Sequence, residues 1–462
     1  MKNELIGALK QRLGNNGILL GEDIGERYHC DWSGIGSQAP LAVLRPCSTE
    51  EVSFIMASCS AVGQAVVVQG GMTGLCGGST PRPGEFGISL ERMSGIEEID
   101  SNAMTMTVLA GTPLETVQQK AGEVGLRFPL DLGARGSCTV GGNIATNAGG
   151  NQVIRYGMAR ALVLGLEAVL ADGTVLTSLN KMLKNNAGFD LKHLFIGTEG
   201  TLGIVTRAVL RLFPVPLTKS TALCGLNNLE DGIQLLHFLN RKLGSGLSTF
   251  EVMWKDYVEY IQEHVSSVRA PFERHYAINV LTEFEGTHRE SDATLFENVL
   301  GEAMEMGLIQ DAIIAKSEKE ASGFWRLRDA IGDVLNAVEG LVSFDISAPI
   351  GLIPKMLWSM TATLENAFDH VTHLTYGHLG DSNIHLSVTT GNEDDIPRIS
   401  DIVYCQAGDF QGSISGEHGI GVMKKKYLSV SKTRSEIELM SGLKQLLDPK
   451  NILNPGRVVP EM

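Results

Sequence analysis

Residues 133–150 read GARGSCTVGGNIATNAGG, and this stretch decides how the chain must fold. Its glycines are interleaved with small polar residues such as Ser137, Thr139 and Asn143, a composition that disfavours helix and strand alike. A chain gives up that much local order where its backbone must approach a ligand closely, because glycine presents bare amides and accepts unusual backbone angles. We therefore predict that residues 133–150 lie along a flat, phosphorylated molecule.

A second glycine-rich loop, GGMTGLCGGS at 70–79, follows a β-branched stretch at 65–69 that predicts a buried strand. Successive backbone N–H groups in such a loop can surround phosphate oxygens. No lysine follows its second glycine pair, so it is not the phosphate loop of nucleoside triphosphatases, and a sharp turn is the simpler alternative. The stretch FIGTEGTLGIV at 195–205 has the same glycine-rich composition.

The chain changes character at 213–216, FPVP, which we take as a domain boundary. Before it, the sequence predicts a helical lead-in over 1–37 and then short strands at 42–46, 88–90, 104–110 and 163–170. After it, predicted strands at 277–281 and 373–376 alternate with predicted helices at 228–243, 288–307, 319–338, 353–368 and 433–448. This order indicates a glycine-rich α/β unit followed by an α+β domain with an antiparallel sheet.

Composition excludes several classes of protein. A net charge of −15 argues against nucleic acid as a partner. No run of 18 apolar residues predicts a transmembrane helix, and residues 1–5 lack the apolar core of a signal peptide. Seven cysteines without a Cys-x-x-Cys spacing fit buried thiols in a reducing compartment, so we expect a cytoplasmic location.

Two histidine motifs indicate a metal and acid–base centre. In HLGDSNIH, residues 378–385, a turn lies between two histidines and could direct both imidazoles to one point. The motif GEHG at 416–419 adds Glu417 as a third ligand, and two histidines with one carboxylate suit zinc, manganese or iron. Without Glu417 and His418, structural histidines would be the simpler interpretation.

The order of these pieces, with Arg45-Pro46 before them and Asn454-Pro455-Gly456-Arg457 at the end, resembles the FAD-binding proteins of the vanillyl-alcohol oxidase type. The resemblance implies an α+β protein. We expect a PCMH-type FAD-binding domain of two α/β subdomains at 38–215. A substrate and metal-binding domain at 216–420 would carry an antiparallel sheet flanked by helices. A helical segment at 421–462 would return to the FAD domain.

The same resemblance implies which residues contact FAD. The 70–79 loop would hold the pyrophosphate, 131–150 would follow the flavin ring and ribityl chain, and 199–204 would lie near the adenine. No histidine lies in the 70–79 loop, and Cys76 is more simply a small buried residue, so we expect FAD to be bound non-covalently. The expected contacts are Pro46, Gln69, Gly70, Gly71, Met72, Thr73, Gly74, Leu75, Gly77, Gly78, Ser79, Asp131, Gly133, Ser137, Cys138, Thr139, Gly141, Gly142, Ala145, Asn147, Gly149, Gly150, Glu199, Gly200, Gly203, Ile204 and Asn454.

The histidine motifs resemble those of the D-2-hydroxyacid dehydrogenase branch of this family. That branch implies that His378, His385 and Glu417 bind a divalent metal, zinc first, and that His418 is the general base. Arg328, Asn383 and His418 would contact the substrate. These implied roles match the chemistry of the reaction. Oxidising a 2-hydroxy acid needs a base for the hydroxyl proton, a Lewis acid on the hydroxyl oxygen and an acceptor for the hydride.

This chain also departs from the pattern of the D-2-hydroxyglutarate branch. Gly332 and Ser343 stand where that branch tends to have a hydroxyl residue and a lysine, which leaves the contacts to a distal carboxylate open. D-2-hydroxyglutarate is the leading expected substrate, and D-lactate or glycolate is the alternative. A non-catalytic flavin-binding subunit and a flavin-free metallohydrolase are alternatives from other classes. The expected electron acceptor is an electron-transfer flavoprotein or a quinone, since no second dinucleotide site is visible.

Overall fold

The computed structural model describes residues 2–269, 272–334, 338 and 340–460. The chain forms two compact units. The first contains residues up to Gly150, then 157–215, and then the residues from Glu417 onward. The second contains 151–156 and 216–416. The chain thus returns to the first unit at Glu417, near the boundary expected at 420.

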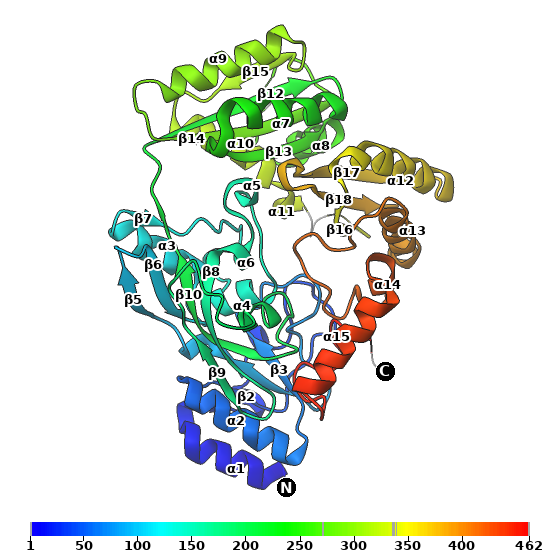
Figure 1. Ribbon diagram of the computed structural model, residues 1–462. Coiled ribbons are helices and arrows are strands. Elements are labelled where there is room, and N and C mark those ends of the chain that lie inside the picture. The colour runs from blue at the N-terminus through cyan, green and yellow to red at the C-terminus, as the bar shows by residue number, and fades with distance from the viewer. Residues whose placement is uncertain (1, 270–271, 335–337, 339, 461–462) are drawn as a thin grey trace. The chain divides into compact units, whose positions relative to one another are not determined.

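The first unit contains two principal sheets (Figure 1). One is four-stranded, in the order β1-β2-β4-β3, with β2, β4 and β3 parallel to one another. The other is five-stranded and antiparallel, in the order β5-β6-β10-β8-β9. Their strands are β1 (Ile18–Leu19), β2 (Val43–Leu44), β3 (Val66–Gln69), β4 (Phe86–Ser89), β5 (Ile96–Asp100), β6 (Thr105–Leu109), β8 (Val163–Val169), β9 (Val175–Ser178) and β10 (Ile204–Arg211). The short strands β7 (Leu126–Arg127) and β11 (Phe213–Pro214) pair separately.

Helix boundaries in this unit follow local chemistry. The Ser48 hydroxyl accepts a hydrogen bond from the Glu51 amide at the start of α2 (Thr49–Val62), and Gly63 ends that helix in the left-handed conformation. A reciprocal capping box between Thr433 and Glu436 opens α15 (Arg434–Leu447). The other helices are α1 (Lys2–Leu13), α3 (Leu114–Glu123), α4 (Val140–Ala145), α6 (Ala159–Leu162) and α14 (Leu428–Ser431).

Two local expectations for this unit were wrong. The lead-in is not helical throughout, because β1 joins the four-stranded sheet by pairing with β2. Residues 133–150 do contain regular structure, since Val140–Ala145 form α4. Tertiary packing overrides propensity there. The Gly141 amide donates to the Ala110 carbonyl at 2.7 Å, and a Cβ on Gly141 would lie 2.8 Å from Ala110 Cβ. Only glycine allows the helix to pack this closely.

The C-terminal segment closes the first unit. The Asn454 side chain accepts a hydrogen bond from the Val68 amide at 2.8 Å and donates one to the Glu199 carbonyl at 2.6 Å. Arg457 is buried and makes two 2.8 Å contacts with the Glu85 carboxylate. These contacts join the C-terminal segment to β3, to Glu199 and to Glu85 before β4, each more than 250 positions away in the sequence.

The second unit is a seven-stranded antiparallel sheet in the order β15-β12-β14-β13-β17-β18-β16. Its strands are β12 (Thr218–Leu226), β13 (Leu247–Trp254), β14 (Ile278–Gly286), β15 (Asp311–Ile314), β16 (Val342–Ser347), β17 (Thr372–His378) and β18 (Asn383–Thr389). Its helices are α5 (Val153–Tyr156), α7 (Leu229–Leu243), α8 (Lys255–His264), α9 (Asp292–Glu305), α10 (Glu318–Asp329), α11 (Ile331–Val334), α12 (Ile353–Ala367) and α13 (Ile396–Asp409). The predicted helix 319–338 is two helices, α10 and α11, and its residues 335–337 lie outside the described residues.

A hydrophobic core joins α8, α10 and α11 to the strands of this sheet, with Tyr257, Leu327 and Ile331 packed against Met253 and Tyr376. Tyr257 also donates hydrogen bonds to the Leu327 and Arg328 carbonyls at the end of α10. The polar side chains described below therefore project from rigid elements. Within the described residues, no helix is both long enough and apolar enough to span a lipid bilayer.

Candidate functional site

The glycine-rich segments of the first unit line two adjoining cavities. The larger, of about 290 Å³, lies between the 70–75 loop and residues 132–149, with Trp32 and His418 also in its wall. The smaller, of about 80 Å³, continues from it past Glu199 and Ile204. Gly70, Gly142 and His418 line both.

Backbone packing holds these walls together. A Cβ on Gly71 would lie 2.0 Å from the Ser137 carbonyl oxygen, and one on Gly70 would lie 2.7 Å from Thr139 Oγ1. The loop after β3 and the chain before α4 are therefore in direct contact, which only glycine permits at these two positions.

The larger cavity contains buried polar groups that the protein does not satisfy. Within the described residues, Thr139 Oγ1 and Asn143 Nδ2 have no hydrogen-bond partner, and both residues line the cavity. An unsatisfied buried donor costs free energy, roughly 1–3 kcal/mol, unless a ligand completes it. The residues present thus fit a polar cofactor lying across α4.

Most of the predicted cofactor residues line one of these cavities. Gly70, Gly71, Met72, Thr73, Gly74, Leu75, Gly78, Ser79, Gly133, Cys138, Thr139, Gly141, Gly142, Ala145, Gly149, Glu199, Gly200, Gly203 and Ile204 do so. Others support the walls: Gln69 donates to the Tyr28 carbonyl, and Asn147 accepts from the Arg160 amide. In the described structure Pro46, Gln69, Gly77, Asp131, Ser137, Asn147, Gly150 and Asn454 do not line either cavity.

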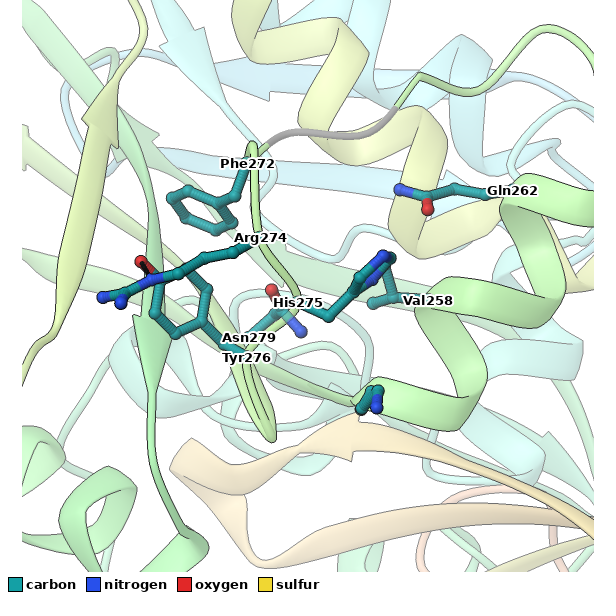
Figure 2. A pocket seen from close by; sticks show the side chains of 8 residues that line it. Val258, Gln262, Phe272, Arg274, His275, Tyr276 and Asn279 are labelled. Atoms are coloured by element: carbon teal, nitrogen blue, oxygen red, sulfur yellow. Dashed lines mark hydrogen bonds between the residues drawn. The ribbon is translucent and has the colours of Figure 1, made fainter.

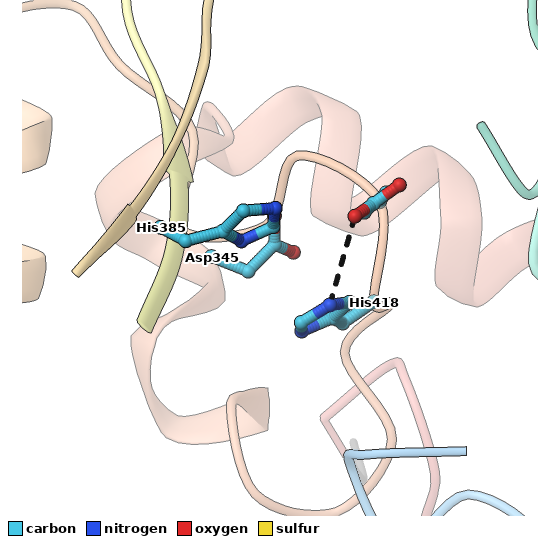
Figure 3. Close-up of side chains that lie close together, drawn as sticks. Asp345, His385 and His418 are labelled. Carbon is cyan, nitrogen blue, oxygen red and sulfur yellow. Dashed lines mark ion pairs between the residues drawn. The ribbon is translucent and has the colours of Figure 1, made fainter. Parts of the chain in front are cut away.

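The segment that carries His418 is fixed within the first unit. Glu199 accepts hydrogen bonds from the amides of Ile420 at 2.7 Å and Gly421 at 2.9 Å. Burial raises the pKa of the Glu199 carboxyl, although these two amides oppose the shift. His418 Nε2 lies 3.8 Å from Glu417 Oε1, the pair joined by a dashed line in Figure 3. The His418 side chain is 27% exposed, so the imidazole can reach a molecule in the cavity.

In the second unit, one buried carboxylate joins two predicted site residues. Glu251 accepts a hydrogen bond from Arg328 Nε at 2.8 Å and lies 2.6 Å from His378 Nδ1. Burial by itself raises the pKa of Glu251, but the interactions with His378 and Arg328 outweigh it and hold the pKa below its usual value. The carboxylate is therefore ionised and fixes both partners.

His378 is held on both sides of its ring. Its Nδ1 faces Glu251, and its Nε2 lies 3.1 Å from Arg328 Nη2. A guanidinium can only donate, so Nε2 must present a lone pair there. A metal would need that same lone pair. Ligation by His378 thus requires that Arg328 Nη2 moves away.

His385 lies on the neighbouring strand, with its ring centroid 5.2 Å from that of His378. The predicted turn between these two histidines thus brings their imidazoles together. Asp345 pairs with His385 in register across β16 and β18, and each offers a metal-ligand atom within 4.8 Å of the other, as the labelled side chains in Figure 3 show. Ser415 donates to Asp345 Oδ2 at 3.0 Å, and the Gly416 amide donates to the Asp345 carbonyl at 3.3 Å. Glu417, which provides a second carboxylate, is the residue directly after Gly416 in the sequence.

Asn383, a predicted substrate residue, begins β18 opposite His378. Its Oδ1 is buried and has no hydrogen-bond partner within the described residues. By contrast, Arg326 on α10 is exposed and pairs with Asp333.

Sequence reasoning missed Glu251 and gave Asp345 no role as a ligand. A signal for Glu251 existed, since a lone charge in the apolar strand LSTFEVMW at 247–254 must have a buried partner. It also missed Asp31, whose carboxylate accepts from the amides of Ser33 and Ser79 beside the 70–79 loop.

A separate hollow on the second unit is lined by Lys255, Val258, Gln262, Phe272, Arg274, His275, Tyr276 and Asn279 (Figure 2). Two of its polar residues are hydrogen-bonded within the protein: Arg274 donates to the Tyr276 hydroxyl at 2.6 Å, and that hydroxyl donates to Asp311 at 3.0 Å.

Comparison with known proteins defines the class. Residues 40–178 match the family model of the FAD binding domain, and residues 215–458 match that of the C-terminal domain of FAD linked oxidases. The fold resembles p-cresol methylhydroxylase, with a TM-score of 0.78 at 15% identity over 99% of this chain and 97% of that one. The chain belongs to the FAD-linked oxidase family, which confirms the predicted α+β fold class and FAD.

Curated relatives align with nearly the whole chain. A probable mitochondrial D-2-hydroxyglutarate dehydrogenase of Oryza sativa subsp. indica is 39% identical over 100% of this chain and 82% of its own length. The D-2-hydroxyglutarate dehydrogenase of Xanthomonas citri pv. viticola is 38% identical over 94% and 92%. A putative mitochondrial D-lactate dehydrogenase of Schizosaccharomyces pombe is 33% identical over 94% and 84%.

Proposed function

We propose that this FAD-dependent dehydrogenase oxidises a D-2-hydroxy acid with the help of a divalent metal, and that D-2-hydroxyglutarate, giving 2-oxoglutarate, is its leading substrate. The observation that carries the proposal is the match, over almost the full length, to relatives named for that activity. The acid–base residues of both units lie within the matched region.

The first unit contributes the cofactor site and the base. A bound flavin supplies the hydride acceptor. The unsatisfied Thr139 and Asn143 donors would orient it across α4. His418, which shares the cavity wall, would take the proton of the substrate hydroxyl at Nε2, because histidine is the side chain best suited to exchanging protons at neutral pH.

The second unit contributes groups that bind the substrate. Arg328 would hold the carboxylate next to the reacting carbon with its forked donors, while Glu251 keeps the guanidinium in place. Asn383 would hydrogen-bond the same end of the substrate.

The metal would be held by His385 and Glu417, with His378 or Asp345 completing the site. Imidazole and carboxylate donors together suit zinc, manganese or iron. A metal supplies Lewis-acid stabilisation of the substrate oxygen when bound.

A panel of D- and L-2-hydroxy acids with an artificial acceptor dye tests the proposal. We expect turnover of D acids only, fastest with D-2-hydroxyglutarate. Faster turnover of D-lactate would favour the second candidate, because Ser343 pairs with the Ser387 hydroxyl at 2.8 Å and presents no cation to a distal carboxylate. Absence of turnover with every acid would exclude the proposed activity.

We propose an electron-transfer flavoprotein or a quinone as the physiological electron acceptor. We also propose that the protein is located in the cytoplasm. Stopped-flow measurement of flavin reoxidation distinguishes the two acceptors. The physiological acceptor should reoxidise the reduced flavin at least as fast as the steady-state turnover rate.

A further inference from the structure

We infer that Glu199 is a positioning residue for His418, an assignment that rests on the proposed role of His418 as the base. The family resemblance assigns Glu199 to the cofactor instead. The contacts of its carboxylate point to the segment that follows His418.

Both carboxylate oxygens of Glu199 hold the backbone just after the base. Oε1 accepts from the Ile420 amide at 2.7 Å, and Oε2 accepts from the Gly421 amide at 2.9 Å. Each oxygen of the buried carboxyl thus satisfies one backbone donor of this segment. A Cβ on Gly419 would lie 2.7 Å from Glu199 Oε1, so the backbone passes as close to the carboxylate as glycine allows.

A second contact holds the same segment from another direction. The Val422 amide donates to the Cys76 carbonyl at 2.9 Å, and the Cys76 thiol donates to the Gly419 carbonyl at 3.3 Å. Residues 419–422 are thus fixed between Glu199 and the loop after β3. The base lies one residue before this fixed segment.

Glu199 is itself anchored to the cofactor walls. Its amide donates to the Ala145 carbonyl at the end of α4 at 2.8 Å, and its carbonyl accepts from Asn454 at 2.6 Å. Its backbone φ is +51°, a left-handed value that non-glycine residues adopt rarely and that the surrounding contacts maintain. One residue therefore links α4, which lines the cofactor cavity, to the segment bearing the base.

A direct cofactor role fits these contacts less well. Both oxygens of its carboxyl already accept backbone amides within the protein. Positioning, in contrast, has a kinetic consequence, since misplacing a catalytic group by about 1 Å can cost about 10²-fold in rate.

The test is Glu199→Gln, which keeps the shape but presents an N–H₂ group to one of the two amides. We expect full FAD occupancy and faster amide exchange in a peptide covering 417–424, measured by hydrogen–deuterium exchange. We also expect kcat to fall by about 10²-fold with KM nearly unchanged, because the base is displaced while substrate binding is intact. Ile420→Pro removes one donor without touching Glu199 and should have the same effects.

Glu167→Gln is the matched control. Glu167 is a buried carboxylate on β8 that accepts hydrogen bonds from Thr49, Thr177 and Thr206, so its loss should lower the melting temperature without changing exchange of 417–424. Unchanged exchange or unchanged kcat in Glu199→Gln would overturn the inference, and loss of FAD would return Glu199 to the cofactor. His418→Ala separates the two proposals: if that variant keeps its kcat, the base assignment fails independently of Glu199.

Discussion

At the scale of single residues, the site depends on how charges are shared. Glu251 divides its two oxygens between a guanidinium and an imidazole, and Arg328 divides its nitrogens between a carboxylate and the same imidazole. A buried charge is tolerated only when it is paired in this way. Each of these residues therefore constrains the others, and substitutions should reveal the coupling.

Arg328→Lys should raise KM for a 2-hydroxy acid by about 10–100-fold, because a lysine keeps the charge but loses the forked donors worth about 1.5–3 kcal/mol. The fall in kcat should be smaller, since the lost contact is made in the ground and transition states alike. Steady-state kinetics with D-2-hydroxyglutarate and D-lactate measure this. Arg326→Lys, on the same helix but exposed, is the control and should change neither constant. Equal losses for both acids place Arg328 on the carboxylate they share.

Glu251→Gln should weaken metal binding by about 10–100-fold, because a carboxylate behind a ligating histidine orients the ring and sets its tautomer. The measurement is a metal titration of the apo-protein, with KM determined in parallel. Glu285→Gln alters another buried carboxylate of the same sheet, paired with Arg155, and should leave metal affinity unchanged. Identical metal affinity in Glu251→Gln and the parent protein would show that His378 is not a ligand.

At the scale of elements, helices with local sequence signals could be predicted, whereas elements that depend on tertiary contacts could not. Capped helices such as α7 and α15 were predicted nearly to their ends, since their signals are local. Helix α4 was not, because its two glycines look unfavourable until Ala110 is known to lie against Gly141. The hairpin of His378 and His385 was predictable from its turn. The contact of Glu251 with this hairpin was not predictable, because 127 positions of sequence separate Glu251 from His378.

Gly142→Val tests α4 as the floor of the cofactor site. A Cβ at this position meets only Thr139 Oγ1 at 3.4 Å, so the fold should tolerate the side chain, which would instead fill the cavity. We expect a folded protein that lacks flavin absorption. Gly122→Val, on α3 with nothing within 4 Å, controls for valine in a helix and should stay yellow. Flavin retained in Gly142→Val would remove α4 from the cofactor site.

The β17–β18 hairpin should carry the metal independently of the flavin. A chelator should abolish turnover while the flavin spectrum is unchanged, and His385→Ala should do the same. Elemental analysis measures the metal directly. His373→Ala, on β17 but outside the group of ligand atoms, is the control and should keep its metal. Turnover that resists chelation in a protein without metal would show that the histidines are structural.

At the scale of the whole molecule, the first unit is assembled from separate stretches of chain. Arg457 is buried against Glu85, 372 positions away, and also donates to the Gly78 and Thr80 carbonyls. The loop that lines the cofactor cavity is thus supported by residues that follow the second unit in sequence. Stability and flavin binding should therefore change together.

Arg457→Ala should lower the free energy of unfolding by about 3–5 kcal/mol, because it removes the cation that pairs with buried Glu85 and leaves that carboxylate with the neutral Arg82 amide. Flavin affinity should fall as well, since Gly78 loses its support. Chemical denaturation and flavin release by fluorescence measure the two effects. Arg434→Ala breaks an exposed ion pair with Glu438 and should cost only about 0.3–0.5 kcal/mol. An unchanged free energy of unfolding in Arg457→Ala would show that the buried Arg457–Glu85 pair makes no net contribution to stability.

The return of the chain at Glu417 also sets an order of events during synthesis. A ribosome adds roughly 5–20 residues per second, so Val68 and Glu85 emerge tens of seconds before Asn454 and Arg457, which follow them by 386 and 372 positions, can reach them. The strands near Val68 and Glu85 must wait through that interval with their later partners not yet made. The second unit can complete its own sheet first. The first unit, which contains the cofactor cavity, is completed only after it. Newly made chains are therefore most exposed to proteases and chaperones at the 70–79 loop, and flavin supplied before Arg457 emerges has no finished cavity to enter.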